Sequence, residues 1–257
     1  TGLFYFNNSA PFFMKEQIFT VNHGDSISKT AHNLEENNLI TNIKFFKGLS
    51  YLFRRRYIRA GKYNIYEGMT SKEILYKLSK GEVITKRVTI PEGYNIYQIA
   101  ERMDQEGICS SGNFLYYSFD KSFLNSIGLD YTSVEGYIFP DTYVFPEESD
   151  ARDIIAAMFN KMKKVLRSLG TDDYYHMNKK THRMLILASL VEKEAQIPGE
   201  RIYVSSVFHN RLKRNMRMDC DPTVRYAVKK FEGRITYSDL ESDSPFNTYR
   251  TKGLPPT

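Results

Sequence analysis

Residues 181–195 read Thr-His-Arg-Met-Leu-Ile-Leu-Ala-Ser-Leu-Val-Glu-Lys-Glu-Ala, and this stretch decides which kind of domain the chain forms. Between Met184 and Val191 the only polar residue is a serine. A helix with so few polar positions is expected to be surrounded by protein on nearly every side. The sequence therefore predicts a buried helix whose last turn carries two carboxylates, those of Glu192 and Glu194.

These two glutamates do not form a facing pair. Successive helical residues turn by about 100°, so side chains two positions apart point about 200° away from each other. At most one of them can face a given cleft, and we favour Glu194 for the buried side of the helix, with Glu192 as the second candidate. The apolar residues in line with each are Leu187 and Val191 for Glu194, and Leu185 and Ala188 for Glu192.

A carboxyl at the end of a buried helix has a characteristic chemistry. Burial disfavours its charged form, so its pKa rises and it stays protonated closer to neutral pH. A protonated carboxyl is what a general acid needs in order to protonate a glycosidic oxygen. The alternative is a structural carboxylate paired with a basic neighbour, Lys193, Arg201 or Arg211.

The first hundred residues repeat a strand-then-helix pattern three times, as Val21-Asn-His-Gly-Asp-Ser, Ile65-Tyr-Glu-Gly-Met-Thr and Ile90-Pro-Glu-Gly-Tyr-Asn. In each copy glycine allows a tight turn out of the strand. The final Ser, Thr or Asn then caps the first free amides of a helix. The pattern predicts small β-α modules and resembles LysM-type modules, which bind glycans rich in N-acetylglucosamine. A plain structural unit is the alternative.

Residues 53–59, Phe-Arg-Arg-Arg-Tyr-Ile-Arg, form a basic cluster interleaved with aromatic residues. A solvated face is one interpretation of such a cluster. The functional alternative is attraction to anionic headgroups or to an anionic polymer.

The composition narrows the class of protein. The 257 residues carry a formal charge of +6 and include no apolar run of the length that spans a membrane. A charge this small and this dispersed does not indicate a nucleic-acid binder. Cys109 and Cys220 lie far apart and form no CxxC pair, so neither a disulfide framework nor a metal site is expected, and we predict no cofactor.

Six motifs together resemble the endolytic murein transglycosylase family called MltG, or YceG-like. The similarity runs from about Phe19 to the end of the chain. In chain order the motifs are Glu135-Gly-Tyr-Ile-Phe-Pro-Asp-Thr-Tyr143, Leu187-Ala-Ser-Leu-Val-Glu-Lys-Glu194, Val207-Phe-His-Asn-Arg-Leu212, Asp221-Pro-Thr-Val224, Ser244-Pro-Phe-Asn-Thr-Tyr249 and Gly253-Leu-Pro-Pro256.

The resemblance implies an α+β fold, in which small LysM-like β-α modules precede a mainly helical, lysozyme-like catalytic domain with β additions. Residues 1–17 would be the stub left after a removed membrane anchor, residues 18–88 the LysM-like module region, and residues 89–257 the catalytic domain, truncated at its C-terminus. The implied location is the bacterial inner (cytoplasmic) membrane, crossed once, with this region extracytoplasmic or periplasmic. The implied partners are peptidoglycan glycan strands and cell-wall synthases.

The family's reaction needs one catalytic carboxyl. One glutamic acid of the Glu-Lys-Glu motif would protonate the oxygen between N-acetylmuramic acid and N-acetylglucosamine, and the muramic C6 hydroxyl would close on C1 to give a 1,6-anhydro end. Matching Lys193-Glu194-Ala195 with the Gln-Glu-Ser step of other lytic transglycosylases again favours Glu194 over Glu192. The residues expected to hold sugar hydroxyls and acetamido groups are Asp221, Thr223, Tyr226, Asn247, Thr248 and Tyr249.

Two other functions remain as alternatives. A non-catalytic peptidoglycan-binding scaffold would recruit cell-wall synthases, and an ordinary hydrolase would leave reducing muramic ends. Two departures from the family pattern bear on activity: Arg225 stands where an apolar residue is usual, and Thr257 ends the sequence where the family continues with a Gly/Pro-rich stretch.

Overall fold

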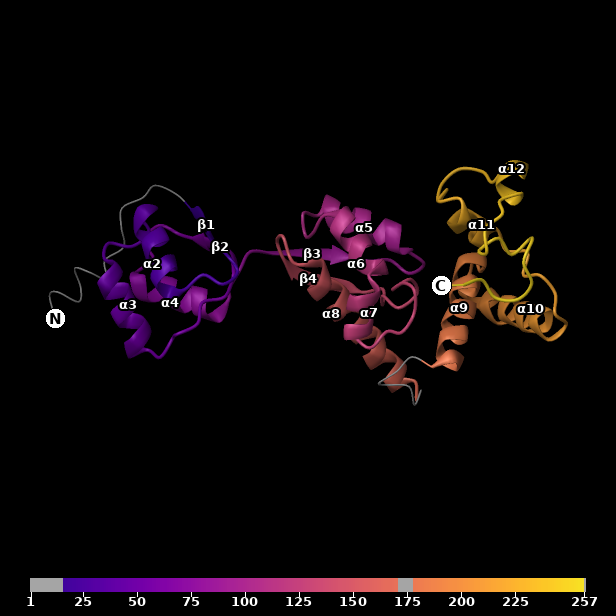
Figure 1. Cartoon of the computed structure of the whole chain (residues 1–257), viewed down its shortest axis with the longest axis horizontal. Helices are drawn as coiled ribbons and strands as arrows, with labels where there is room; N and C mark the ends of the chain where they lie inside the picture. The colour runs from indigo at the N-terminus through magenta and orange to yellow at the C-terminus, as the bar shows by residue number, and fades with distance from the viewer. Residues whose placement is uncertain (1–15, 171–177, 257) are drawn as a thin grey trace. The chain divides into compact units, whose positions relative to one another are not determined.

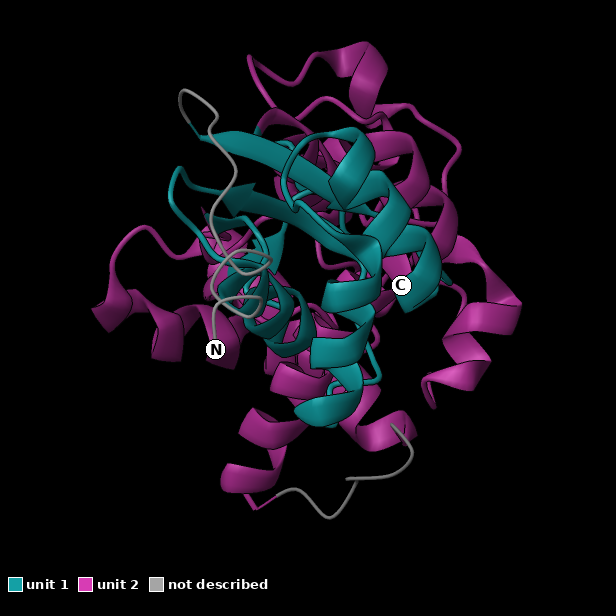
Figure 2. Ribbon diagram, turned by 90° about the vertical axis from the view of Figure 1, so that its left-hand side faces the viewer, with its two compact units in different colours: residues 1–87, 106–108, 144–149 teal, residues 88–105, 109–143, 150–257 magenta. Residues whose placement is uncertain are grey.

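The computed structural model describes residues 16–170 and 178–256 (Figure 1). The chain divides into two compact units (Figure 2). Unit 1 contains the chain up to Arg87 together with residues 106–108 and 144–149, and unit 2 contains the rest. Apart from residues 16 and 17, the predicted N-terminal stub lies outside the described residues.

Unit 1 is built on a two-stranded antiparallel sheet. Strand β1 (Gln17–Val21) pairs with β2 (Gly61–Ile65), with Gln17 opposite Ile65 and Val21 opposite Gly61. Helices α2 (Ile27–Glu36) and α3 (Ile43–Leu52) connect the strands, and α4 (Ser71–Lys80) follows β2. Alternate strand residues point to one face, and the core of the unit forms there from Phe19, Val21, Tyr63 and Ile65 with apolar residues of the three helices.

The three repeated motifs form the turns and caps that the sequence predicts. Their glycines have φ angles of +82°, +84° and +76°, which only glycine adopts without strain. The side chains of Ser26, Thr70 and Asn95 accept hydrogen bonds from the amides of Lys29, Glu73 and Gln98 at 3.2, 3.3 and 3.0 Å. The β-α modules are therefore present, although the first two share one sheet.

Unit 2 is mainly helical. Its strands β3 (Thr85–Thr89), which begins in unit 1, and β4 (Thr142–Pro146), which ends there, form a second two-stranded sheet. The helices are α5 (Ile96–Gln105), α6 (Ser111–Phe119), α7 (Lys121–Ser126), α8 (Ala151–Ser168), α9 (Lys179–Glu194), α10 (Arg201–Lys213), α11 (Asp221–Ala227) and α12 (Tyr237–Leu240), with a 3-10 turn, η1 (Pro198–Glu200), before α10. The mixed α and β composition agrees with the predicted class.

Helix α9 is less buried than its sequence predicts. Only Thr181, Ile186 and Leu190 are buried, and Met184 keeps 43% of its surface exposed. One apolar side of the helix faces an open cleft rather than a packed neighbour, as described below. The prediction that protein surrounds this helix on nearly every side is therefore wrong.

The opposite side of α9 packs into a small core. Leu190 is buried with Phe208, Met218 and Cys220, and a second layer of partly buried apolar residues closes around them. This core joins α9 to α10 and to the segment before α11, and it fixes the orientation of the last turn of α9. Within the part of the chain that the structure describes, no helix is long and apolar enough to cross a membrane.

A capping-box variant tests the local construction of unit 1. Thr70 and Glu73 cap each other's backbone amides at the start of α4. Thr70→Ala removes this exchange and should lower the free energy of unfolding of unit 1 by about 1 kcal/mol, measured by urea denaturation. Ser79→Ala is the control, because Ser79 bonds a carbonyl within the same helix. Equal effects of the two substitutions would contradict the capping argument.

Candidate functional site

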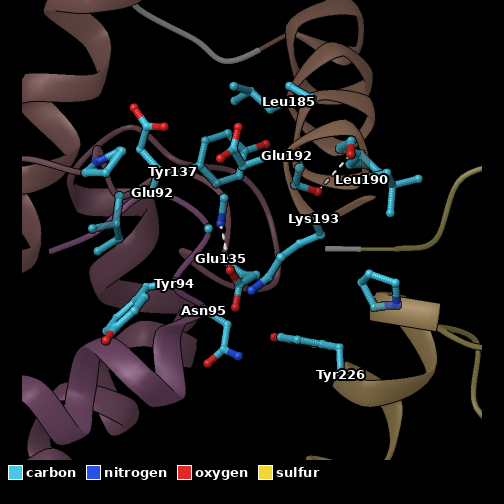
Figure 3. A pocket seen from close by; sticks show the side chains of 18 of the residues that line it. Glu92, Tyr94, Asn95, Glu135, Tyr137, Leu185, Leu190, Glu192, Lys193 and Tyr226 are labelled. Carbon is cyan, nitrogen blue, oxygen red and sulfur yellow. Dashed lines mark hydrogen bonds between the residues drawn. The ribbon is translucent and has the colours of Figure 1, made fainter. Parts of the chain in front are cut away.

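The two glutamates at the end of α9 face different hollows. Glu192 lines a cleft of about 630 Å³, together with residues of α5, α9 and α11 and the segment 135–140 (Figure 3). Glu194 lines a smaller pocket of about 230 Å³, between α9, α10 and the segment before α11. The expectation that the two carboxylates do not face each other is confirmed.

The two apolar lines of α9 have different neighbours. Leu187 and Val191, in line with Glu194, pack against the small core of unit 2, whereas Leu185 and Ala188, in line with Glu192, border the large cleft. Glu194 thus continues the packed side of the helix, as predicted. The packed side, however, is not the side that borders the larger cleft.

Glu192 is held by an ion pair. The Arg201 guanidinium lies 3.0 Å from one oxygen of the Glu192 carboxylate and 3.3 Å from the other, and it also reaches Glu92 at 3.5 Å. Both carboxylate oxygens are therefore engaged by the same cation. Glu192 is therefore the structural carboxylate that the sequence offered as an alternative, because it is paired with Arg201.

Glu194 has a different neighbour. The Cys220 thiol donates a hydrogen bond to its Oε1 at 3.0 Å. Burial, together with this bond to Glu194, raises the pKa of the Cys220 thiol, so the sulfur keeps its proton and acts as a donor. Among the described residues, no basic side chain lies within ion-pair distance of Glu194; the nearby Arg211 pairs with Asp219 instead, at 3.0 Å.

The residues predicted to bind sugar gather around Cys220. Thr248 accepts a hydrogen bond from the Cys220 amide at 3.1 Å, and its hydroxyl lies 2.8 Å from that of Thr223. The Tyr249 hydroxyl donates to Asp221 at 2.7 Å. Segments far apart in the sequence, α9, α11 and the 247–249 loop, therefore converge beside Glu194.

Not all of these residues are accessible to a ligand. Asn247 and Thr248 are fully buried, and the Asn247 amide group donates to the carbonyls of Leu240 and Ser242 at 2.9 and 2.8 Å. Such bonds hold the loop in shape. Asp221 and Tyr249 remain exposed to solvent at least in part. Direct contact of Asn247 and Thr248 with sugar stays a prediction.

Tyr226 lies on the large cleft instead. Its ring packs 4.9 Å from that of Phe246 and 6.0 Å from that of Tyr97, measured between centroids. Thr223 lines the same cleft and also bonds Thr248. Of the predicted sugar-binding residues, Thr223 and Tyr226 therefore line the large cleft, and none lines the smaller pocket beside Glu194.

Sequence reasoning missed Glu135 as a site residue. Its carboxylate accepts hydrogen bonds from the amides of Ile96 at 3.0 Å and Gly136 at 3.2 Å, and from the Tyr226 hydroxyl. The Lys193 side chain also extends toward it across the cleft (Figure 3). Glu135 therefore ties the start of α5 to α11 and to the end of α9.

The sequence predicts a buried carboxyl with a raised pKa at the end of α9. The structure has such a carboxyl at Glu135 instead. Protein surrounds it although the residue keeps some exposure to the cleft, and this burial raises its pKa above the ordinary 4.5, against the opposing effect of its hydrogen bonds. The signal in the sequence was a charge directly before Gly136, inside a run of aromatic residues. Its partners lie too far away along the chain to be read from that pattern.

The raised pKa of Glu135 predicts that the difference in stability between Glu135→Gln and wild type depends on pH. Protonated Glu135 stabilises the fold below the ordinary pKa, and this contribution is lost as pH rises through the folded-state pKa. Glu135→Gln is neutral at every pH, so its stability relative to wild type should increase from about pH 4 toward neutrality. Thermal unfolding across this range measures the difference.

The matched control for this comparison is Glu232→Gln, at an exposed position. Because this substitution removes a carboxyl without removing a buried one, its stability relative to wild type should change less with pH than that of Glu135→Gln. A difference between Glu135→Gln and wild type that does not change with pH would contradict the role of burial at Glu135.

Known proteins resemble this chain in sequence and in fold. The model of the YceG-like family matches residues 19–257. The chain belongs to the YceG-like family. Its relatives include the endolytic murein transglycosylase of Bacillus subtilis, 33% identical over 94% of this chain and 72% of that protein, and that of Streptococcus pneumoniae R6, 29% identical over 91% of this chain and 48% of that protein.

A solved structure extends the match to the fold of this YceG-like chain. The crystal structure of a yceG-like protein from Listeria monocytogenes superposes with a TM-score of 0.59 at 30% identity, covering 94% of this chain and 85% of that one. The family recognised from sequence motifs is therefore confirmed. The enzyme class expected with it, lytic transglycosylase, agrees with the name that both relatives carry.

Proposed function

We propose that this YceG-like chain is an endolytic peptidoglycan lytic transglycosylase. It cleaves the β-1,4 bond between N-acetylmuramic acid and N-acetylglucosamine in nascent strands and leaves 1,6-anhydro-muramic ends, with Glu194 as general acid and base. The observation that carries the proposal is a carboxylate at the end of α9 that has no described basic partner and has the Cys220 thiol as its partner, with Thr248 and the Asp221–Tyr249 pair next to that cysteine.

The reaction proceeds in two proton transfers. Protonated Glu194 gives its proton to the glycosidic oxygen as the bond from that oxygen to C1 of the muramic residue breaks. The muramic C6 hydroxyl then forms a bond to C1, and the Glu194 carboxylate takes its proton. The glutamic acid is regenerated and no water is consumed, so one carboxyl is sufficient, in contrast to the carboxyl pair of ordinary glycosidases.

The neighbours of Glu194 suit this double role. A cation beside the carboxylate would favour its charged form more strongly than a neutral donor does. The Cys220 thiol, in contrast, is neutral and donates to Glu194 from a buried position. Asp221 and Tyr249 add polar atoms to the same region, at 2.7 Å from each other, where sugar hydroxyls can exchange hydrogen bonds with them.

Glu192 is the second candidate for the acid, and one observation favours it. The cleft that it lines, about 630 Å³, lies in the range of ordinary ligand sites, whereas the hollow beside Glu194 is smaller. Against this role, Arg201 holds both of its carboxylate oxygens. Glu192 must leave that ion pair before it can protonate a substrate.

Paired glutamine variants separate the two candidates. Glu194→Gln should lower the rate of anhydro-muropeptide formation from isolated peptidoglycan by about 10²–10⁴-fold, because it removes the proton that the reaction transfers. Glu192→Gln, the control, should keep most of the activity. Mass spectrometry of the products measures the rate, and circular dichroism checks that each variant is folded.

The other outcomes of this experiment each overturn a stated part of the proposal. Loss of activity only in Glu192→Gln would transfer the catalytic role to Glu192. Products heavier by one water would identify an ordinary hydrolase. A folded wild type that binds peptidoglycan but forms no product would favour a non-catalytic scaffold that recruits cell-wall synthases.

The Cys220 thiol is proposed as a positioning group for Glu194. Cys220→Ser keeps a donor of similar size and should keep activity near that of wild type. Cys220→Val keeps the packing but removes the donor, and the lost hydrogen bond should lower kcat about tenfold with little change in KM. Equal kcat values for the two variants would show that packing alone matters at this position.

The remaining expectations belong to the same proposal. Unit 1 acts as a LysM-like module that holds glycan, and the chain works at the outer face of the bacterial cytoplasmic membrane, attached by a single-pass anchor and beside cell-wall synthases. The glycan-holding part is supported by the strand-helix-helix-strand order of β1, α2, α3 and β2 with its capped helices. Binding of Glu194→Gln to insoluble peptidoglycan, measured with and without substitutions in unit 1, tests the glycan-holding part.

A further inference from the structure

The proposed reaction leaves one motif of the sequence unused. Residues 51–59, Tyr-Leu-Phe-Arg-Arg-Arg-Tyr-Ile-Arg, form the end of α3 and the connection toward β2 in unit 1. This segment, called the 51–59 segment below, contains four arginines and no acidic residue. Its charge therefore stays positive at every pH at which the protein is folded.

The backbone holds the first part of the segment in a defined turn. Helix α3 ends at Leu52, and Arg54 adopts a left-handed φ of +53°. The Arg54 amide donates to the Tyr51 carbonyl at 3.2 Å and the Arg55 amide to the Ser50 carbonyl at 2.9 Å, which closes the helix end. The arginines are thus presented by an ordered helix terminus.

Two of these cations, those of Arg55 and Arg56, have aromatic rings rather than carboxylates as neighbours. The Arg55 guanidinium lies 4.9 Å from the centroid of the Tyr76 ring, and that of Arg56 lies 5.8 Å from the Tyr51 ring. Within residues 16–170 and 178–256, no carboxylate lies within 4.0 Å of the guanidinium groups of the segment's four arginines. A ring orients a cation without neutralising it, so the positive charge remains available to an anionic partner.

Apolar and aromatic side chains of the same segment are exposed. Tyr51, Leu52 and Tyr57 keep 67%, 69% and 87% of their surface in contact with solvent. Tyrosine favours the boundary between water and an apolar phase, because one end of its ring is apolar and the other is polar. Arginine likewise leaves its charged head in water while its stem lies along apolar surface.

We propose that the 51–59 segment docks unit 1 onto an anionic phospholipid surface. Arginines in this position attract acidic headgroups, and the exposed Leu52 and the two tyrosines enter the boundary between headgroups and acyl chains. A soluble polyanion complements the arginines equally well but offers no apolar phase for Leu52. The combination of charge and exposed apolar side chains therefore selects a bilayer over a polymer.

Vesicle binding by the whole chain tests this proposal. Wild-type protein should sediment with phosphatidylcholine vesicles that contain phosphatidylglycerol and not with phosphatidylcholine alone, and added salt should weaken the binding. The triple variant Arg54→Gln, Arg55→Gln, Arg56→Gln should bind about 100-fold more weakly, at about fivefold for each basic residue near an anionic surface. The double variant Leu52→Ser, Tyr57→Ser should also weaken binding. Because the lost contribution is apolar, the weakening should be the same at low and at high salt.

A matched triple variant controls for net charge. Lys179→Gln, Lys180→Gln and Arg183→Gln remove the same charge from exposed positions at the start of α9, and this variant should bind vesicles as wild type does. Both triple variants should keep the lytic activity on isolated peptidoglycan, so failure of the docking proposal is distinct from failure of the proposed reaction.

Three results would overturn the docking proposal. One is wild-type protein that does not bind vesicles containing phosphatidylglycerol. Another is equal weakening by the two triple variants, which would reduce the effect to net charge. The third is that the protein binds a poly(glycerol phosphate) polymer at least as tightly as it binds vesicles, and that Leu52→Ser with Tyr57→Ser does not weaken binding to the polymer. This result would identify a soluble polyanion as the partner.

Discussion

The angular step of the α-helix is the constraint on which the site depends. Because Glu192 and Glu194 are two residues apart, one helix end serves two different environments. The small core of unit 2 fixes the rotation of α9 by burying Leu190, and this decides which carboxylate meets Arg201 and which meets the Cys220 thiol. A change in that rotation would change the surroundings of both carboxylates, so the packing of Leu190 controls which acid lies beside the thiol.

The cleft beside this helix is held by a buried carboxyl, that of Glu135, which the reaction does not use. Glu135 is expensive to bury, and the structure offsets the cost with two backbone amides and the Tyr226 hydroxyl. In return one carboxylate joins three segments that are distant in sequence. The Glu135 carboxylate also lies at the start of α5, where the free backbone amides and the helix dipole favour a negative group. A buried charge of this kind favours one arrangement of its partners over others because each alternative arrangement leaves it unpaired.

Local features were predictable from sequence and distant ones were not. Turn glycines and caps such as Ser26 depend on residues three or four positions away, so the three repeated motifs gave correct turns and helix starts. The 200° separation of Glu192 and Glu194 needed only helix geometry. The exposure of α9 was predicted wrongly, because an apolar surface that lines a cleft has the same composition as one in a core. The site role of Glu135 was missed because the partners of its carboxylate other than Gly136, among them Ile96 and Tyr226, lie 39 or more residues away.

The partners of the carboxylates in unit 2 also indicate how one chain separates structural from reactive acids. A carboxylate held by a guanidinium, as in Glu192, is fixed in its position. One held by amides in a buried site, as in Glu135, is fixed in position but costly to ionise. A group that must lose and regain a proton in each cycle is not served by a permanent opposite charge, and the partner of Glu194 is a neutral thiol. The choice of partner, rather than the carboxyl itself, therefore divides these acids between support and catalysis.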